Sequence, residues 1–213
     1  MDKVITKKEV EEKLITSLLE KVSNKGFIFR KKDKRIIRKT ENGFEAFSFV
    51  ILNYWPYCEE IDWVGYSIRL NKIEDIINPI MAKHDLYNME FAKTSTTISQ
   101  WWRPNIQVFS DEDVNKFLRD NLDKIEEDGL SFFSRHNDFS SVNLIEKERI
   151  LCNYNNVYNT SVPIMSSLIL MKLCNDNDFD ELKIRYRQIL LPRHGLEKRD
   201  FAAYDDLVNY LSQ

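Results

Sequence analysis

The clearest pattern of hydrophobic and polar positions lies between residues 44 and 70, where two apolar runs are separated by a short polar break. In the first run, apolar side chains occupy both faces of a strand, at Phe44, Ala46, Val50 and Leu52 on one face and at Phe47, Phe49 and Ile51 on the other. Such a strand is covered on both sides. The second run has Val64, Tyr66, Ile68 and Leu70 on one face. The pattern predicts a central antiparallel strand pair, with Phe49 and Ile68 in the core.

Shorter strands are predicted on both sides of this pair. Residues 27–40 indicate two short strands around a Lys-Lys-Asp-Lys turn, and the Asn-Gly pair that follows indicates a hairpin into the central strand. Residues 94–98 and 106–109 are the last predicted strands. The segment between them contains Trp101, Trp102 and Pro104, and the proline favours a turn or a sheet edge. If the two tryptophans lay in a strand, they would point to opposite faces.

Helical periodicity marks the beginning of the chain, one segment in its middle and most of its second half. Residues 6–23 have apolar positions at steps of four, and residues 72–83 form a second helix that Pro79 is expected to kink or shorten. Ser110 is a good N-cap for a helix over residues 111–128, and Gly129 is its predicted end. No strand is predicted beyond that glycine. The remaining predicted helices cover residues 130–135, 144–151, 163–175, 179–190 and 201–211.

Strands followed by helices predict an α+β fold, in which an antiparallel sheet built from residues 27–109 packs with the N-terminal helix and precedes a helical C-terminal part. We expect a single domain over residues 1–213, because no Pro- or Gly-rich linker divides the chain. Within it, a helical C-terminal subdomain is expected from about residue 139. The hydrophobic fraction of 43% in 213 residues is enough for a substantial core.

Charge is distributed unevenly along the chain. Residues 1–40 contain 13 Lys and Arg against 6 Asp and Glu, an excess of +7, and the other residues contain 18 against 28, an excess of −10, which together give the net charge of −3. This asymmetry predicts that a partner is steered to one end of the protein. Seven of the cations fall within residues 30–39. They support an alternative function, nucleic-acid or nucleotide binding through Lys32, Arg35 and Arg38, although stacking aromatics are missing from the stretch.

The break between the central strands predicts a protein-binding site. It places Trp55 and Tyr57 beside Glu59, Glu60 and Asp62, and we expect the acids to be solvated at a hairpin tip. Exposed aromatic residues bordered by charge are typical of protein contacts. We therefore predict that these five residues bind a partner protein.

The sequence offers no recognisable catalytic set. Its five glycines are isolated, so there is no phosphate-binding loop, and neither a nucleophile elbow nor a metal-ligand spacing is present. The histidines, His84, His136 and His194, each lie beside a charged residue in loop-like sequence. We expect no cofactor and no metal, and we favour a protein that is not an enzyme. An enzyme whose site forms only in three dimensions is the remaining alternative.

The cysteines bear on the compartment. Cys58, Cys152 and Cys174 are odd in number and widely spaced, which favours free thiols in a reducing cytoplasm, with Cys58 the most reactive. The first residues are charged and show no secretory signal, and the longest apolar run is too short to span a bilayer. We therefore expect a cytoplasmic protein with no membrane partner.

Several features together resemble a known family. They are the leading helix, the segment Gly-Phe-Ile-Phe-Arg-Lys-Lys, the strand ending Val-Gly-Tyr-Ser-Ile-Arg-Leu, the Trp-Trp pair ahead of an acid-capped helix, and Gly-Leu-Ser-Phe-Phe. Over residues 5–150 the chain resembles an uncharacterised bacterial family known only as a domain of unknown function. The resemblance implies an α+β fold and a bacterial cytoplasmic protein, and it provides no catalytic residues. By analogy with small bacterial domains, our leading hypothesis is a non-catalytic protein-binding protein with an immunity or accessory role.

Overall fold

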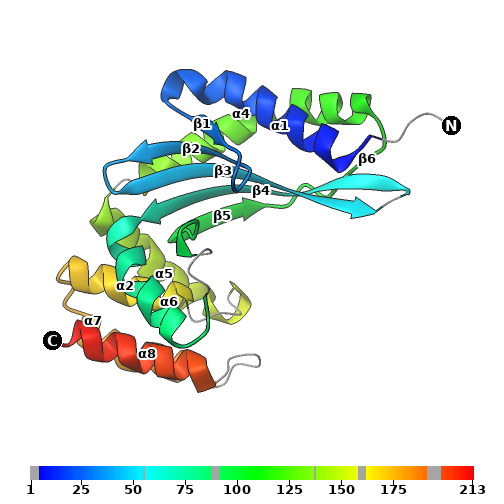
Figure 1. Cartoon of the computed structure of the whole chain (residues 1–213). Helices are drawn as coiled ribbons and strands as arrows, with labels where there is room; N and C mark the ends of the chain where they lie inside the picture. The colour runs from blue at the N-terminus through cyan, green and yellow to red at the C-terminus, as the bar shows by residue number, and fades with distance from the viewer. Residues whose placement is uncertain (1–4, 55, 88–91, 137, 158–161, 191–197) are drawn as a thin grey trace. The chain divides into compact units, whose positions relative to one another are not determined.

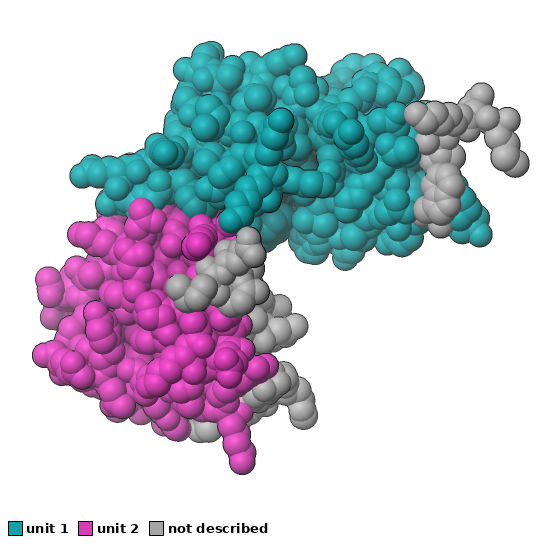
Figure 2. Space-filling view, in the orientation of Figure 1, with its two compact units in different colours: residues 1–68, 98–134 teal, residues 69–97, 135–213 magenta. Residues whose placement is uncertain are grey.

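The computed structural model describes residues 5–54, 56–87, 92–136, 138–157, 162–190 and 198–213. It confirms the α+β class: an N-terminal helix precedes a six-stranded antiparallel sheet, and helices follow (Figure 1). The chain forms two compact units. Unit 1 comprises residues 1–68 and 98–134, and unit 2 comprises residues 69–97 and 135–213 (Figure 2). Unit 2 therefore contains a segment from the middle of the chain in addition to the C-terminal helices.

The sheet follows the order of the sequence. Its strands, in spatial order, are β1 (Ile28–Arg30), β2 (Arg35–Thr40), β3 (Gly43–Tyr54), β4 (Cys58–Leu70) and β5 (Ile98–Trp102), and β6 (Ile106–Val108) also pairs with β4. The predicted central pair is thus β3 and β4, and both predicted hairpins before it are present. Residues 44–48 are buried on both faces, whereas Phe49 is only partly buried. Ile68 lies in the core as predicted, and Phe49 does not lie fully within it.

The strand predicted at residues 94–98 was placed too early, because β5 contains both tryptophans. β5 pairs with β4 from Ile68↔Ile98 to Val64↔Trp102, and β6 pairs with β4 from Ile61 onwards. Between these two ladders, residues 103–105 lie opposite residues 62–63, so three residues face two, as in a β-bulge. Pro104 occupies this bulge, where the missing N–H removes no ladder hydrogen bond. The proline therefore lies in the interruption between β5 and β6, both of which pair with β4.

Two helices cover one face of the sheet in unit 1 (Figure 1). Helix α1 (Lys7–Val22) begins with a capping box between Thr6 and Glu9, and a short 3₁₀ turn, η1 (Ser23–Lys25), follows it. The apolar stripe predicted for α1 is buried. Helix α4 (Asp111–Arg135) begins after Ser110, as predicted: Asp113 accepts hydrogen bonds from the Ser110 N–H at 2.9 Å and from its hydroxyl at 2.9 Å.

Gly129 does not end α4, contrary to the prediction. It is buried within the helix and lies against the rings of Phe47 and Tyr66. The absence of a side chain lets α4 approach the sheet at this point. Around it, Phe47 packs edge-on against Phe133, with ring centroids 5.1 Å apart, and against Phe27 at 5.2 Å. This aromatic cluster is the centre of the unit 1 core.

Unit 2 is mainly helical in its described residues, although it begins with Arg69 and Leu70 at the end of β4. It contains α2 (Asn71–Lys83), α5 (Phe139–Val157), α6 (Val162–Leu173), α7 (Phe179–Leu190) and α8 (Lys198–Leu211). These helices include all those predicted beyond residue 139. Helix α6 is the most buried, and α2 packs against both α6 and α8 (Figure 1). Pro79 lies inside α2 and does not shorten it. No helix of the described chain is both long and apolar enough to cross a membrane.

A buried polar network joins α2 to the segment that leads into β5. The Glu74 carboxylate accepts hydrogen bonds from the hydroxyls of Ser95 at 2.5 Å and Thr97 at 2.8 Å. Arg69 lies 3.7 Å from the same carboxylate and donates to the carbonyl of Ser95 at 3.0 Å. Burial, with a smaller contribution from the Glu74 charge, raises the pKa of Tyr87 to about 12. The network fixes this segment to α2, which is a structural role.

Candidate functional site

The residues predicted to bind a partner have very different environments. Trp55 lies outside the described residues. Tyr57 is 74% exposed, as expected for the end of a hairpin. In contrast, Glu59 and Asp62 are only 3% and 4% exposed because they belong to β4, and Glu60 is half-buried. The prediction of solvated acids at a turn is therefore wrong for Glu59 and Asp62.

Glu59 connects β4 to the N-terminus of α1. One of its carboxylate oxygens accepts a hydrogen bond from the Asn53 amide at 2.9 Å, and the other is buried without a hydrogen-bond partner among the described residues. Burial raises the pKa of Glu59, while the Lys7 N–H and side-chain charge act in the opposite direction. A carboxylate at the first turn of a helix also interacts favourably with the helix dipole. Glu59 is therefore buried within electrostatic reach of the first turn of α1 and is not presented to a partner.

Asp62 holds an arginine that comes from the bulge. The Nε atom of Arg103 donates to Asp62 Oδ1 at 2.6 Å, and this hydrogen bond raises the pKa of Arg103. The Arg103 guanidinium lies over the Trp63 ring, 5.0 Å from its centroid. Glu60 and Tyr54 are within electrostatic reach of the same guanidinium. The carboxylate is buried and the arginine is half-exposed, so the pair presents N–H donors to solvent.

Trp101 lies next to this pair on the same sheet. It is the cross-strand partner of Gly65, and a Cβ atom built on that glycine would lie only 2.4 Å from the indole ring. The Trp101 Nε1–H donates to the Ser99 hydroxyl at 3.2 Å. The rings of Trp63 and Trp101 meet edge-on, 6.4 Å apart at 85°. Trp102 points to the other face and stacks on Phe117 of α4, as the alternation predicted.

Together these side chains form what we call the aromatic surface: Val50, Tyr54, Trp63, Trp101 and Arg103. Val50, Trp63 and Trp101 line a hollow of about 250 Å³ in it. Tyr54 and Trp101 are 46% and 43% exposed. The sequence prediction included Glu60 and Asp62, which contact or approach Arg103, and missed Trp63, Trp101 and Arg103. The only signal was Gly65, because a glycine inside a strand indicates that another group approaches closely.

The chain matches no family model, no curated protein and no solved structure. The resemblance to a bacterial family of unknown function therefore stays a prediction. Function is argued below from the site itself.

The two predicted arginines of the basic stretch have acidic neighbours within the protein. Arg38 donates to Glu45 at 2.7 Å and lies over the Phe27 ring at 4.6 Å. Arg35 is partly buried 3.8 Å from Asp33, and burial lowers its pKa. Lys32 is exposed. Two of the three predicted nucleic-acid contacts are thus engaged within the protein, while Lys31, Lys32 and Lys39 of the same stretch are exposed.

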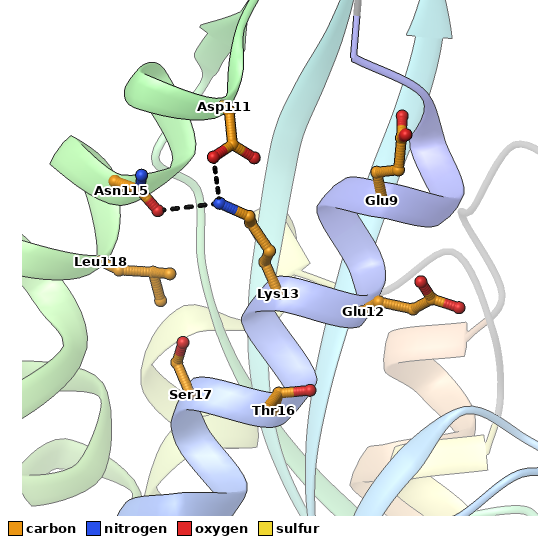
Figure 3. Close-up of a pocket in the computed structure, with 8 residues that line it drawn as sticks. All are labelled: Glu9, Glu12, Lys13, Thr16, Ser17, Asp111, Asn115 and Leu118. Atoms are coloured by element: carbon orange, nitrogen blue, oxygen red, sulfur yellow. Dashed lines mark hydrogen bonds and ion pairs between the residues drawn. The ribbon is translucent and has the colours of Figure 1, made fainter.

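Several lysines of the basic N-terminal part form ion pairs with acids of α4, so their positive charge is partly neutralised within the protein. Lys13 contacts Asp111 at 2.5 Å, and Lys21 and Lys25 contact acids of α4 at 2.6 Å each. Figure 3 shows the first pair in a hollow of about 400 Å³, where Lys13 also donates to Asn115 at 3.0 Å. The hollow is lined by Glu9, Glu12, Lys13, Thr16, Ser17, Asp111, Asn115 and Leu118. Lys13 already contacts Asp111 and Asn115 of α4, so we interpret the hollow as a contact between the two helices.

The described histidines do not form part of a catalytic or metal site. His84 contacts Asp206 at 2.8 Å, but Asp206 also accepts from Lys83 at 2.6 Å, which is the pattern of a surface ion-pair cluster. His136 is buried, and His194 lies outside the described residues. No group of three potential metal ligands occurs in the described part of the chain. These contacts do not form a recognisable catalytic arrangement.

The cysteines differ from the prediction in one respect. All three are free thiols, but Cys58 is buried in β4, Cys174 is partly buried and Cys152 is exposed. Burial also raises the pKa of the Cys174 thiol, which lowers its thiolate fraction. The prediction that Cys58 is the most reactive is therefore wrong on accessibility.

Proposed function

We propose that this protein is a non-catalytic binding protein that contacts another protein through the aromatic surface. The observation that carries the proposal is the apolar hollow between the perpendicular rings of Trp63 and Trp101, bordered by Arg103. Tryptophan, tyrosine and arginine are the residue types that contribute most to binding energy at protein interfaces. Tyr54 and the hairpin residue Tyr57 add exposed aromatic area in the same unit.

The aromatic surface is held in place before any partner arrives. Trp101 is fixed by contact with Gly65 and by the hydrogen bond to Ser99. Trp63 is covered by Arg103, which is itself held by buried Asp62. Side chains that are already ordered lose less conformational entropy on binding. This supports a role in recognition.

The partner that we propose is a bacterial cytoplasmic protein, in line with the family resemblance, and the role is that of an immunity or accessory protein. A toxin gene beside the gene for this chain would favour the immunity role. The nucleic-acid alternative is less well supported because Arg35 and Arg38 have acidic neighbours. An enzyme remains the other alternative, and measurable turnover on a small substrate would favour it.

The proposal is tested by comparing three baits in the native host. These are the wild type, the double variant Trp63→Ala, Trp101→Ala, and the control Ile28→Ala, which removes a more exposed apolar side chain from β1 at the other edge of the sheet. We expect one protein to be retained by the wild type and the control and lost by the double variant. The same difference must then be reproduced with the purified partner, as an affinity at least about 10-fold weaker for the double variant. Equal retention by all three baits would refute the proposal.

A further inference from the structure

The hollow on the aromatic surface is small and apolar. Its volume of about 250 Å³ is below the roughly 300 to 1,000 Å³ of typical small-molecule sites. Three side chains line it, Val50, Trp63 and Trp101. The one polar atom of the Trp101 ring already donates to Ser99. The hollow is therefore lined mainly by apolar side-chain atoms, and its size suits one large side chain.

The charges around the hollow disfavour a charged occupant. A cation would lie beside the Arg103 guanidinium, which already covers the Trp63 ring at 5.0 Å. An anion would add a third carboxylate near a guanidinium that already has Asp62 at 2.6 Å and Glu60 nearby. Arg103 nevertheless carries five N–H donors on a half-exposed side chain, and Asp62 receives the one on Nε. Its complement is a neutral acceptor such as a main-chain carbonyl.

From these observations we infer that the hollow is an anchor pocket for one large, uncharged apolar side chain of the partner protein, while Arg103 donates to a main-chain carbonyl of the partner beside that side chain. The inference rests on the proposed function and specifies its chemistry. Anchor side chains that fill a central pocket commonly dominate the affinity of an interface. The partner's other contacts then surround this pocket.

Defined probes test the chemistry of the pocket directly. The N-acetyl amides of phenylalanine, leucine, lysine and glutamate each carry one side chain and main-chain carbonyl groups. We expect the phenylalanine and leucine probes to shift the indole N–H NMR signals of Trp63 and Trp101, with at least about 10-fold weaker binding of the lysine and glutamate probes. Arg103→Lys should weaken the neutral probes because it keeps the charge and loses the donor fork. Equal binding of charged and neutral probes would refute the inference.

A plugged variant separates this inference from the proposed function. Val50→Phe fills the hollow with the protein's own ring, and Ile28→Phe adds the same ring at the other edge of the sheet as a control. We expect only the first to lose probe and partner binding, with both still folded by near-UV circular dichroism. A partner that binds Val50→Phe normally but not the double tryptophan variant would refute the pocket and leave the proposed function standing. If Val50→Phe instead abolishes a self-association seen by sedimentation, the occupant is a second copy of the chain and the inference is wrong.

Discussion

Gly129 of α4 and the ring of Phe47 in β3 are so close that a Cβ atom built on the glycine would lie 2.1 Å from Phe47 Cε1. The Phe47 ring is itself almost fully buried, so it has no free space into which to move. Gly129→Ala should therefore destabilise the protein by about 1 to 3 kcal/mol, even though alanine is the better helix former. Urea unfolding measures this against Glu127→Ala, an exposed position in the same helix. A variant as stable as the wild type would mean that α4 does not pack this closely.

Gly65→Ala meets a ring at a similar distance but should have a different result. The added Cβ would lie 2.4 Å from the far end of the Trp101 ring, and Trp101 is exposed enough to swing outward. We expect a loss of stability below about 1 kcal/mol together with a red-shifted, more accessible tryptophan emission. The hollow would be lost with the ring position, so partner binding should fall. An unchanged emission spectrum would contradict the contact between Gly65 and Trp101.

Truncating Phe49 of β3 and Ile68 of β4 to alanine should reduce the stability of the protein by different amounts. Ile68 is buried, so Ile68→Ala should cost about 2 to 5 kcal/mol from lost transfer energy and the cavity that remains. Phe49 is only partly buried, so Phe49→Ala should cost less than Ile68→Ala despite the larger side chain removed. Thermal and urea unfolding of both variants check the order. The reverse order would place Phe49 in the core after all.

Glu146 should make stability depend on pH. Burial raises the pKa of this α5 carboxyl, and the nearby Arg149 charge offsets only part of the effect. From the ordinary value of about 4.3 up to the raised pKa, the folded state binds more protons than the unfolded state, so this group's contribution to stability is full below that window and falls as pH rises through it. Glu146→Gln removes the titration.

The stability of Glu146→Gln minus that of the wild type should therefore increase as the pH is raised from 4 to 7.5, because only the wild type loses the contribution of this group. Urea midpoints of the two proteins at both pH values measure the change, and Glu148→Gln on the exposed side of α5 is the control. A stability difference that does not vary with pH would show that the Glu146 pKa is not raised.

Thiol labelling should follow exposure. Cys152 is exposed, so it should react first with a thiol reagent in the folded protein, ahead of Cys174 and then Cys58. Unfolding without reductant should release three titratable groups. Mass spectrometry of the labelled peptides gives the order. Labelling of Cys58 before Cys152 would show that the hairpin end opens readily.

The sequence predicted local structure well because apolar periodicity and capping residues act within a few positions. The Ser110 cap, the hairpin turns and the α+β class all follow from neighbouring residues. The errors arose where a distant segment determines the outcome. Gly129 resembles a helix end until Phe47 is placed beside it, and the Trp101 strand depends on its pairing with Gly65.

The candidate site was harder to predict for the same reason. Glu59 and Asp62 look solvated in sequence, but both are buried in β4, where Asp62 is paired with Arg103, which is far away along the chain. The basic stretch looked like a binding surface because Asp33 and Glu45 were not seen as its partners. Side-chain pairing between distant segments is information that residue spacing does not contain.

The ion pairs between α1 or η1 and α4 join residues that are 98 to 102 positions apart, from Lys13–Asp111 to Lys21–Asp123. At a synthesis rate of about 5 to 20 residues per second, the lysines of α1 are made roughly 5 to 20 s before their partners in α4. Unit 1 also contains residues 98–134, so it cannot close until the middle segment of unit 2 has been translated. When residue 134 has left the ribosome, unit 1 is complete, whereas residues 69–97 still lack the C-terminal helices that they pack against. On the ribosome, the two units therefore finish folding in a fixed order, and α4 is the last part of the first unit to be made.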